Sequence, residues 1–560
     1  MLKVVHWLKK DKLSKDLEKA NFLLCNKKGG YLYLSTKRET KNQGFFINEN
    51  FSLFKSIENI QINGQITKAT NKFSSVTFER DNNAIEHFIL PYEHNAFIYE
   101  LKKYRDDLIL DLDCRGAWDK DQWGRYYNVQ IEKNRIIISY EKQNDYHLYV
   151  VITGKNLNAE KIREWHNVHY PLDNIRKDEP DREIYKAVKL QIKSDTKLVF
   201  STNTNREKAI KEGDYVYRNI NKLKRKQDNA MIHKTNIKNK IQRMAYNAAL
   251  NSLNGLLSEI DNNLGIIRAF PWYYKFWSRD EMYAIKALGK RKEASEIYSR
   301  TLWGIRPKGT IPNINPSPEN GCVDITGLFY YRYSKRDELK KTILALETNH
   351  ESKGFVVNKP KQTWMDSIDR EGPRIEVQAL MLNMYNLIGE KNKELTLKNR
   401  VKELFWNGKY LNDGIDDFTI RPNFILAYFF YPDLLTKEEW MKCFNNTLPK
   451  LSCSWGGIST LDRNSGLYEP MNTGININSY HSGDSFFFIN NIAAMAMLRL
   501  NKRHYKDRIK NIVDSSTEEI LWNGFLGHHS ELSSAKKMES RGCRCEAKAA
   551  ATYIELLNEF

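Results

Sequence analysis

Acidic, basic and aromatic side chains with the potential for chemistry are concentrated in a few polar stretches of the chain. The most complete is residues 362–377, QTWMDSIDREGPRIEV, which contains Trp364, Asp366 and Glu376. Gly372 and Pro373, with no clear period of 2 or 3.6, predict a loop. Loops with this composition often carry functional side chains, because the elements around them hold them over a cleft. Taken alone, the stretch is equally typical of a salt-bridged surface loop with one half-buried tryptophan.

Four further stretches carry candidate side chains on predicted loops or at predicted helix starts. They are PWYYKFWSRDE at 271–281, VDITGLFYY at 323–331, SYHSGDSFFF at 479–488 and HHSELSS at 528–534. Their candidates are Trp277, Arg279, Asp280, Asp324, Tyr480, His481, Asp484 and Glu531. Several of these residues could instead have a purely structural role. Ser278, Asp280 and Asp324 are suited to capping helices, and a single histidine such as His481 is more often a hydrogen-bonded structural residue.

Acids, aromatic residues and arginines on loops are the equipment of a glycosidase. In that chemistry one carboxylic acid protonates the leaving oxygen and one carboxylate activates water. Metal catalysis is not indicated, because His528, His529 and Glu531 lack the spacing of a helical H-E-x-x-H motif. The sequence has no phosphate-binding or dinucleotide-binding glycine loop and no G-x-S-x-G motif. We therefore expect no metal and no cofactor.

Composition narrows the class of protein. Aromatic residues make up 12% of the chain. Such a content is typical of proteins that stack aromatic rings on sugars, although a large aromatic core is the commoner reason for it. The 88 lysines and arginines exceed the 69 acids and are scattered. Their densest run, Lys222 to Lys226, is predicted to be a solvated linker, and nucleic-acid binding remains a weak alternative.

Cysteine usage and apolar runs predict a cytoplasmic protein without membrane contact. The seven cysteines are irregularly spaced, which favours reduced thiols. Cys543 and Cys545 have no second pair nearby that would complete a zinc site. The amino-terminal residues lack an apolar signal core, and the longest apolar run, residues 424–431, is far too short to span a bilayer.

A chain of 560 residues is expected to form two domains. Residues 1–225 are predicted to form a β-sandwich. Tyr31 to Leu34 follow a glycine pair, 126–132 and 135–140 flank a two-residue turn, and apolar residues alternate at Val188, Leu190 and Ile192.

Residues 226–560 show helical periodicity separated by long polar loops. Helices are expected near 238–261, 279–289, 291–303, 323–333, 335–348, 375–389, 392–406, 423–431, 435–447, 482–499, 505–521 and 543–558. Twelve helices suit six hairpins closed into a double ring, an (α/α)6 barrel. The longest loops follow every second helix, which would gather them, and a cleft, at one end.

Together these stretches resemble a known family. FPWYYKFWSRDEMYAIKALG, QTWMDSID followed by RIEVQALMLNMYNL, IRPNFILAY, SYHSGDSFFFINN and GHHSELSS occur in this order. They are similar to the glucosidase part of glycogen debranching enzymes, in the stand-alone archaeal and bacterial form. NFLLCNKKGGYLYLSTK, residues 21–37, resembles the start of that family's amino-terminal β-sandwich. The resemblance implies an (α/α)6 catalytic domain and an inverting amylo-α-1,6-glucosidase acting on glycogen, limit dextrin or malto-oligosaccharides.

The resemblance also implies roles for individual residues. Asp366 matches the general acid and Glu531 the general base. Positions that line the glucose pocket match Trp277, Arg279, Asp280, Asp324, Trp364, Glu376 and His481. The apolar neighbours of Asp366 are expected to raise its pKa, and the polar neighbours of Glu531 are expected to favour its carboxylate.

The sequence departs from the family pattern at two places. Phe486 or its neighbour stands where a tryptophan is usual, and residues 542–548, including Glu546 and Lys548, replace a Gln-Ala-Trp pattern. These departures leave the linkage preference open. Three alternatives therefore stay open: an α-1,4-glucosidase resembling glucoamylase, an inverting phosphorylase on the same fold, and a glucan-binding protein without catalysis. The oligomeric state is not predicted.

Overall fold

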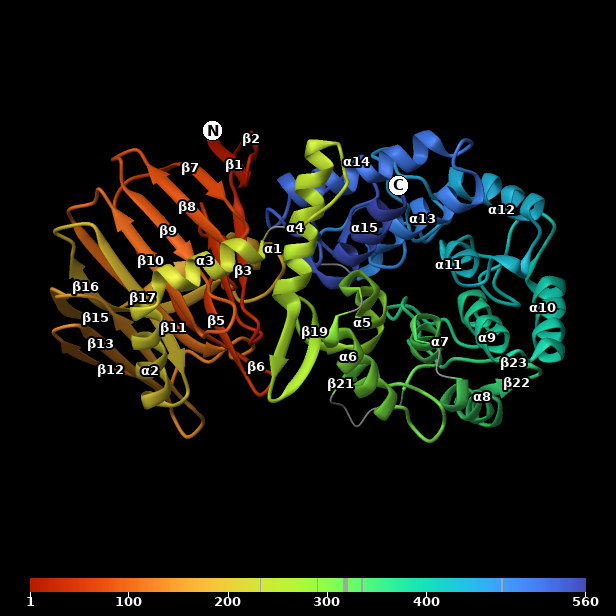
Figure 1. Ribbon diagram of the computed structural model, residues 1–560, viewed down its shortest axis with the longest axis horizontal. Coiled ribbons are helices and arrows are strands. Elements are labelled where there is room, and N and C mark those ends of the chain that lie inside the picture. Colours follow the sequence, from red (N-terminus) through yellow and green to blue (C-terminus); the bar gives the residue numbers. More distant parts are fainter. Residues whose placement is uncertain (232, 290, 316–320, 334–335, 475–476) are drawn as a thin grey trace. The chain divides into compact units, whose positions relative to one another are not determined.

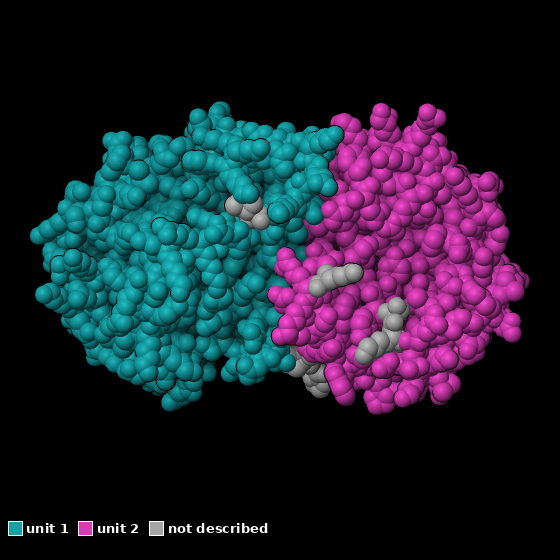
Figure 2. Space-filling model, viewed as in Figure 1, with its two compact units in different colours: residues 1–264, 520–528 teal, residues 265–519, 529–560 magenta. Residues whose placement is uncertain are grey.

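The computed structural model describes residues 1–231, 233–289, 291–315, 321–333, 336–474 and 477–560. The chain divides into two compact units (Figure 2). Unit 1 comprises Met1–Leu264 and Ile520–His528, and unit 2 comprises Gly265–Glu519 and His529–Phe560. Strands dominate the first unit and helices the second (Figure 1), which confirms a β-rich amino-terminal region followed by a helical one. The division into domains at residues 1–225 and 226–560 stays a prediction.

Unit 1 is built from two large, mainly antiparallel sheets. In the described residues one sheet has the strand order β12-β13-β14-β17-β10-β9-β8-β7-β1-β2 and the other β15-β16-β11-β6-β5-β4-β3. The strands of the first are β1 (Leu2–Leu8), β2 (Asp11–Leu17), β7 (Ile66–Asn71), β8 (Ser75–Arg80), β9 (Ile85–Ile89), β10 (Ala96–Lys102), β12 (Arg125–Glu132), β13 (Arg135–Lys142), β14 (His147–Thr153) and β17 (Thr196–Asn203). Those of the second are β3 (Asn21–Cys25), β4 (Tyr31–Ser35), β5 (Gly44–Glu49), β6 (Ser52–Gln61), β11 (Asp107–Gly116), β15 (Ala159–His169) and β16 (Asp181–Gln191).

The two sheets share one hydrophobic core. Phe45 and Leu110 from the second sheet are buried in the same cluster as Phe97 and Ile138 from the first. Such a core forms because alternate side chains of a strand point to one face of its sheet. The hairpin predicted around residues 133–134 is confirmed, since β12 and β13 pair with Glu132 opposite Arg135.

The predicted linker at residues 222–226 is wrong. Helices α2 (Arg206–Arg218) and α3 (Ile220–Ala230) follow strand β17, and the short helix α1 (Pro171–Ile175) lies earlier, between β15 and β16. Ile220 and Leu223 of α3 are buried against the sheet residues Ile98 and Val199. The sequence did not reveal this helix, because its apolar stripe is narrow and its lysines are numerous. One of these lysines, Lys224, donates a hydrogen bond to Glu100 at 2.8 Å.

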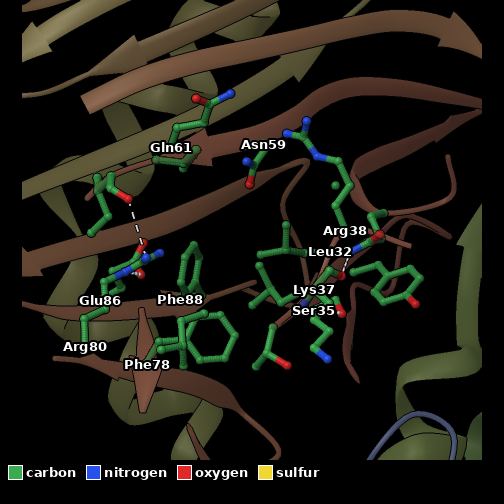
Figure 3. A pocket seen from close by; sticks show the side chains of 18 of the residues that line it. Leu32, Ser35, Lys37, Arg38, Asn59, Gln61, Phe78, Arg80, Glu86 and Phe88 are labelled. Atoms are coloured by element: carbon green, nitrogen blue, oxygen red, sulfur yellow. Dashed lines mark hydrogen bonds and ion pairs between the residues drawn. The ribbon is translucent and has the colours of Figure 1, made fainter. Parts of the chain in front are cut away.

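Unit 1 also contains a cavity of about 720 Å³. Figure 3 shows Phe78 and Phe88 lining it, with Asn59 and Gln61 on another side. It lies between strands of the two sheets, and none of the candidate residues from the sequence lines it. The two arginines that line it, Arg38 and Arg80, each form an ion pair with a neighbouring carboxylate.

Unit 2 is organised around a closed ring of helices. Among the described residues α5, α7, α9, α11, α13 and α15 each contact the next, and α15 contacts α5 (Figure 1). These inner helices are α5 (Ser278–Ala284), α7 (Val323–Arg332), α9 (Ile375–Ile388), α11 (Asn423–Phe430), α13 (Phe487–Asn501) and α15 (Ala547–Glu559). Between them in sequence come α6 (Lys292–Trp303), α8 (Arg336–His350), α10 (Lys391–Phe405), α12 (Lys437–Leu451) and α14 (Lys506–Trp522).

One long helix, α4, and several shorter elements complete the chain. They are α4 (Lys240–Leu256), the turns of 3-10 helix η1 (Ile285–Leu288), η2 (Pro432–Leu434) and η3 (Ile477–Ser479), and the strands β18 (Leu257–Ile260), β19 (Asn263–Phe270), β20 (Tyr273–Trp277), β21 (Ile314–Asn315), β22 (Glu351–Ser352), β23 (Phe355–Val356), β24 (Ser485–Phe486), β25 (Leu532–Ser533) and β26 (Cys545–Glu546). Each of the twelve predicted helices has a counterpart. Five differ by four or five residues at one end: 238–261 ends at Leu256, 435–447 continues to Leu451, 482–499 begins at Phe487, 543–558 begins at Ala547, and 279–289 is α-helical only to Ala284, with η1 after it. Residue 335 lies outside the described part. Within the described part of the chain, no helix is both long and apolar enough to cross a bilayer.

Candidate active site

The candidate residues of unit 2 gather where the inner helices begin. Trp277 and Arg279 lie at the start of α5, Asp324 at the start of α7, and Asp366 in the loop that precedes α9. The segments before α13 and α15 supply Tyr480, His481, Asp484 and Glu531. Tyr273 to Trp277, expected in a loop, form strand β20. The helical ring therefore brings together residues from widely separated parts of the sequence.

Glu531 is buried and held from three directions. Its carboxylate accepts hydrogen bonds from the Tyr480 hydroxyl, from Arg268 Nη2 at 3.2 Å, and from the Cys543 backbone N–H at 3.0 Å. Gly542 has a φ of +61°, and a Cβ there would collide with the Glu531 carboxylate. A glycine is therefore required at 542 both for its conformation and for the close approach of Glu531.

Arg268 connects Glu531 to the next carboxylate. Its guanidinium carbon lies 3.9 Å from the Tyr273 ring centroid and 4.5 Å from that of Trp277. Its Nε is 3.5 Å from Asp280 Oδ1, and Lys548 Nζ is 3.0 Å from the same oxygen. Two cations thus compensate the buried Asp280, and two aromatic faces cover one of them.

Asp366 has a different environment from Glu531. No described side chain or backbone N–H donates a hydrogen bond to its carboxylate. Burial raises the pKa of Asp366, while the charges of Arg279, Arg268 and Lys548 lower it. The direction agrees with the expectation from the sequence. Burial, followed by the charge of Glu531, raises the pKa of Tyr480, and the charge of Asp366 adds to the shift.

Arg279 and Asp324 form a buried bidentate pair. Nε lies 2.8 Å from Oδ2 and Nη2 3.2 Å from Oδ1. Neither Asp280 nor Asp324 caps a helix, because no side chain caps α5 or α7. The capping alternative is therefore wrong for both, and Asp324 instead orients an arginine that lowers the pKa of Asp366.

Trp364 and His481 pack against each other. Their rings meet edge to face with centroids 5.4 Å apart, and Trp364 Nε1 donates to Asn423 Oδ1 at 2.7 Å. His481 Nδ1 is 2.6 Å from the Ser367 hydroxyl, whereas its buried Nε2 has no partner in the described chain. Burial, followed by Arg421, lowers the pKa of His481 well below its ordinary value, so the ring is neutral.

Phe486 completes this aromatic wall. Its ring is stacked on that of His481, with centroids 5.1 Å apart, and lies 5.6 Å from that of Trp364. The position at which the sequence departs from the family pattern therefore touches two candidate residues. An aromatic ring is retained there, without the hydrogen-bonding indole N–H.

Glu376 and Asp484 are occupied by structural partners. Both oxygens of Glu376 accept from Arg370, at 2.6 and 3.1 Å, and Arg370 also binds both oxygens of Asp413. Glu376 therefore anchors the loop around Asp366. Asp484 Oδ2 accepts from Asn472 and Ser479 at 2.6 and 3.0 Å. Burial raises the pKa of Asp484 to about 7.

Sequence reasoning missed three charged members of this cluster, Arg268, Glu546 and Lys548. Arg268 lies on strand β19 outside every motif, so nothing in its neighbours marked it. Glu546 and Lys548 were noticed only as departures from the family pattern. Burial raises the pKa of Glu546 to about 8, and Lys548 lies 3.2 Å from its Oε1. In the described residues no three His, Cys, Asp or Glu side chains are arranged to hold a metal ion.

Part of the sequence is similar to a known protein family. Residues 348–555 match the sequence profile of the family described as amylo-alpha-1,6-glucosidase. Among curated proteins, none matches the sequence significantly.

Solved structures match the fold. A bacterial glucoamylase complexed with acarbose is similar over 97% of this chain and 95% of its own, with 13% identity and a TM-score of 0.59. A glycosidase in complex with glucose matches 58% of this chain and 98% of its own, with 9% identity and a TM-score of 0.43. An uncharacterized conserved protein from Thermus thermophilus matches 55% of this chain and 98% of its own, with 12% identity and a TM-score of 0.42.

The first of these structures shares the fold of the whole chain, a β-rich region followed by a helical one. The matched segment 348–555 contains Asp366, Tyr480, His481 and Glu531 and ends within α15. Residues 348–555 thus match the amylo-alpha-1,6-glucosidase family, and the protein is a glycoside hydrolase.

Proposed function

We propose that the protein is an inverting glycoside hydrolase that releases glucose from α-1,6 branch points of glycogen, limit dextrin or related α-glucans. Asp366 is the general acid and Glu531 the general base. The observation that supports this assignment is the unequal environment of the two carboxyl groups. Asp366 is half-buried and has no hydrogen-bond donor in the described chain, which favours the protonated acid, whereas Glu531 receives three donors, which favour the carboxylate.

The reaction follows from these two states. The Asp366 carboxylic acid transfers its proton to the glycosidic oxygen as the bond to the anomeric carbon breaks. Glu531 accepts a proton from a water molecule, whose oxygen attacks the anomeric carbon from the opposite face. The product is glucose of inverted configuration. This geometry requires the two carboxyl groups to be roughly 6.5–9.5 Å apart, which leaves space for the water.

The surrounding polar side chains are proposed to bind the hydroxyl groups of glucose. Arg279 and Asp324 present a fixed fork, and the neutral His481 offers an Nε2 that lacks a partner in the described chain. Trp277 and Trp364 supply ring faces. Asp280, Tyr480 and Asp484 complete the proposed pocket, and Glu376 acts by holding Arg370 and the loop.

The proposed architecture is a β-sandwich over residues 1–225 and an (α/α)6 barrel over residues 226–560. The closed contacts of the inner helices and the fold shared with the bacterial glucoamylase support it. That neighbour is bound to acarbose, so an α-1,4-glucosidase resembling glucoamylase is the second candidate. A phosphorylase is less well supported, because that mechanism has no use for a base held as Glu531 is.

The test compares panose, isomaltose, maltose and phosphorylase limit dextrin as substrates. We expect glucose release, with NMR showing the β-anomer first from an α-linkage. Asp366→Asn and Glu531→Gln should each lower kcat by at least about 10²-fold while the variant stays folded. Release of the α-anomer first would refute inversion. Folded variants with wild-type activity would refute the two assignments, and a preference for maltose would favour the α-1,4 candidate.

A further inference from the structure

Unit 2 contains a second cavity, of about 700 Å³, next to the loop that carries Asp366. Its walls come from the turn between β22 and β23, from residues 357–362, and from Glu371 to Pro373 at the other end of the loop. Lys308 and Arg400 also line it. The volume lies within the range of small-molecule sites, about 300–1,000 Å³.

The cavity carries an excess of positive charge. Lys308, Lys353, Lys359 and Arg400 line it, against the carboxylates Glu371 and Asp416. In the described chain none of these four cations forms an ion pair. The unit 1 cavity is different, because its Arg38 lies 3.1 Å from Asp111 and its Arg80 2.7 Å from Glu86. Exposed lysines are commonly just solvated, so the charge alone does not define a site.

A histidine at the edge of the cavity supplies an independent observation. His350 Nε2 is buried and has no hydrogen-bond partner among the described residues. Burial, then Lys308 and Lys359, lower the pKa of His350. Its ring and the two ammonium groups line the same cavity. The His350 carbonyl accepts a hydrogen bond from the Val357 N–H at 2.8 Å, which ties its backbone to the cavity wall.

The side chain of Arg400 is held against an aromatic ring in the cavity wall. Its guanidinium carbon lies 4.7 Å from the centroid of the Phe355 ring. Gly354, with a φ of +75°, allows this approach, since a Cβ there would collide with the Arg400 guanidinium. A fixed guanidinium without a carboxylate partner suits an oxyanion such as phosphate, which accepts two parallel N–H bonds.

The cavity wall is continuous with the loop of Asp366. The Gly372 N–H donates to the Asn358 carbonyl at 2.9 Å, and Asn358 Nδ2 donates to the Arg370 carbonyl at 2.5 Å. At the other end of the loop, the Gln362 carbonyl accepts from Arg279 Nη2 at 3.4 Å. A ligand in the cavity would therefore contact both ends of the loop.

We propose that this cavity binds a small organic phosphate, such as a sugar phosphate, and that the bound ligand restrains the loop that carries Asp366. Lys308, Lys359 and Arg400 bind the phosphate oxygens, and His350 Nε2 faces the same group. Phe355, Val357 and Leu404 contact the uncharged body of the ligand. This site is separate from the proposed reaction, because none of its lining residues belongs to the proposed acid, base or glucose pocket.

Calorimetry with inorganic phosphate, glucose 6-phosphate and glucose tests the site directly. We expect saturable binding of glucose 6-phosphate, weaker binding of inorganic phosphate and none of glucose. The double variant K308Q/K359Q should bind glucose 6-phosphate at least about tenfold more weakly, because charged hydrogen bonds are lost. The control K340Q/K341Q changes the net charge equally on α8, outside the lining, and should bind as the wild type does.

Three results would overturn the proposal. They are no binding of either phosphate, equal binding by the two double variants, and equal affinity for inorganic phosphate and glucose 6-phosphate. The restraint on the loop is measured by hydrogen exchange in the D366N variant, which needs no catalysis. Exchange over residues 362–373 should slow with glucose 6-phosphate, and an unchanged rate would refute the coupling. Failure of the proposed hydrolysis would leave these binding results intact.

Discussion

Replacing Arg268 by methionine tests the part of the site that sequence motifs did not reveal. The substitution keeps most of the length of the side chain and removes its charge. It removes the guanidinium group whose Nη2 lies 3.2 Å from Glu531 and whose Nε lies 3.5 Å from Asp280. At 3.2 Å and an effective dielectric constant near 20, one such charge pair has an attraction of about 5 kcal/mol before desolvation is counted.

The net loss of stability is smaller than this attraction. Breaking a buried ion pair typically costs about 3–5 kcal/mol. Glu531 keeps its bonds from Tyr480 and the Cys543 N–H, and Asp280 keeps Lys548. We therefore expect the lower end, about 3 kcal/mol, for unfolding of unit 2. A base displaced by about 1 Å costs about 10²-fold in rate, so kcat should fall by that factor.

The pH profile gives a second readout for R268M. Arg268 lowers the pKa of Asp366, and burial raises it. A general acid must be protonated, so activity declines as the pH rises through its pKa. Removing Arg268 raises that pKa further, and the alkaline decline should move to higher pH.

The matched control is R300M. Arg300 also pairs with a buried carboxylate, Glu281, and lies over an aromatic ring, 5.1 Å from the centroid of Phe276. It has no hydrogen bond or ion pair with Glu531 within the described contacts. Glucose release from panose and thermal unfolding are measured on both variants. If R268M and R300M lose stability and activity in the same proportion, Arg268 has no specific part in the site.

Two further predictions concern the neighbours of Glu531. Gly542→Ala combines a left-handed φ with a collision against Glu531, whereas the control Gly408→Ala has a φ of +83° and open space around it. Both should lose about 1–2 kcal/mol of stability from backbone strain, but kcat should fall only in the first; equal activities would contradict the close contact. Glu546→Gln removes a carboxyl group whose pKa burial raises from 4.5 to about 8. The folded wild type holds that proton more tightly than the unfolded chain, so its stability decreases as the pH rises from 4.5 to about 8. The melting temperature of the variant should decrease less over this range. Equal pH dependence of the two melting temperatures would refute the raised pKa of Glu546.

Much of the local structure was predictable from the sequence. The hairpin at 126–140 follows from alternation around a polar turn, and the helices of unit 2 follow from the spacing of their apolar residues. Helix α3 escaped because only Ile220, Leu223 and Gln227 are buried on it, and one of these is polar. A pattern of hydrophobicity cannot identify a helix whose buried face is this narrow.

The sequence predicted which residues belong to the candidate site, but not which side chains bind them. Asp366 and Glu531 stand in recognisable stretches, but the donor Arg268 lies 263 positions from Glu531 on an unremarkable strand. Glu376 looked as available as Asp366, yet the fold gives both its oxygens to Arg370. Asp324 looked like a helix cap and is instead the partner of Arg279.

The sequence by itself determined which chemical groups the chain can offer and which secondary structures carry them, because propensity and periodicity act between near neighbours. Only the tertiary structure decided which carboxyl group is left without donors and which receives three. Desolvation and Coulomb interactions act through space, and the side chains that set them here come from strands and helices far apart in the chain.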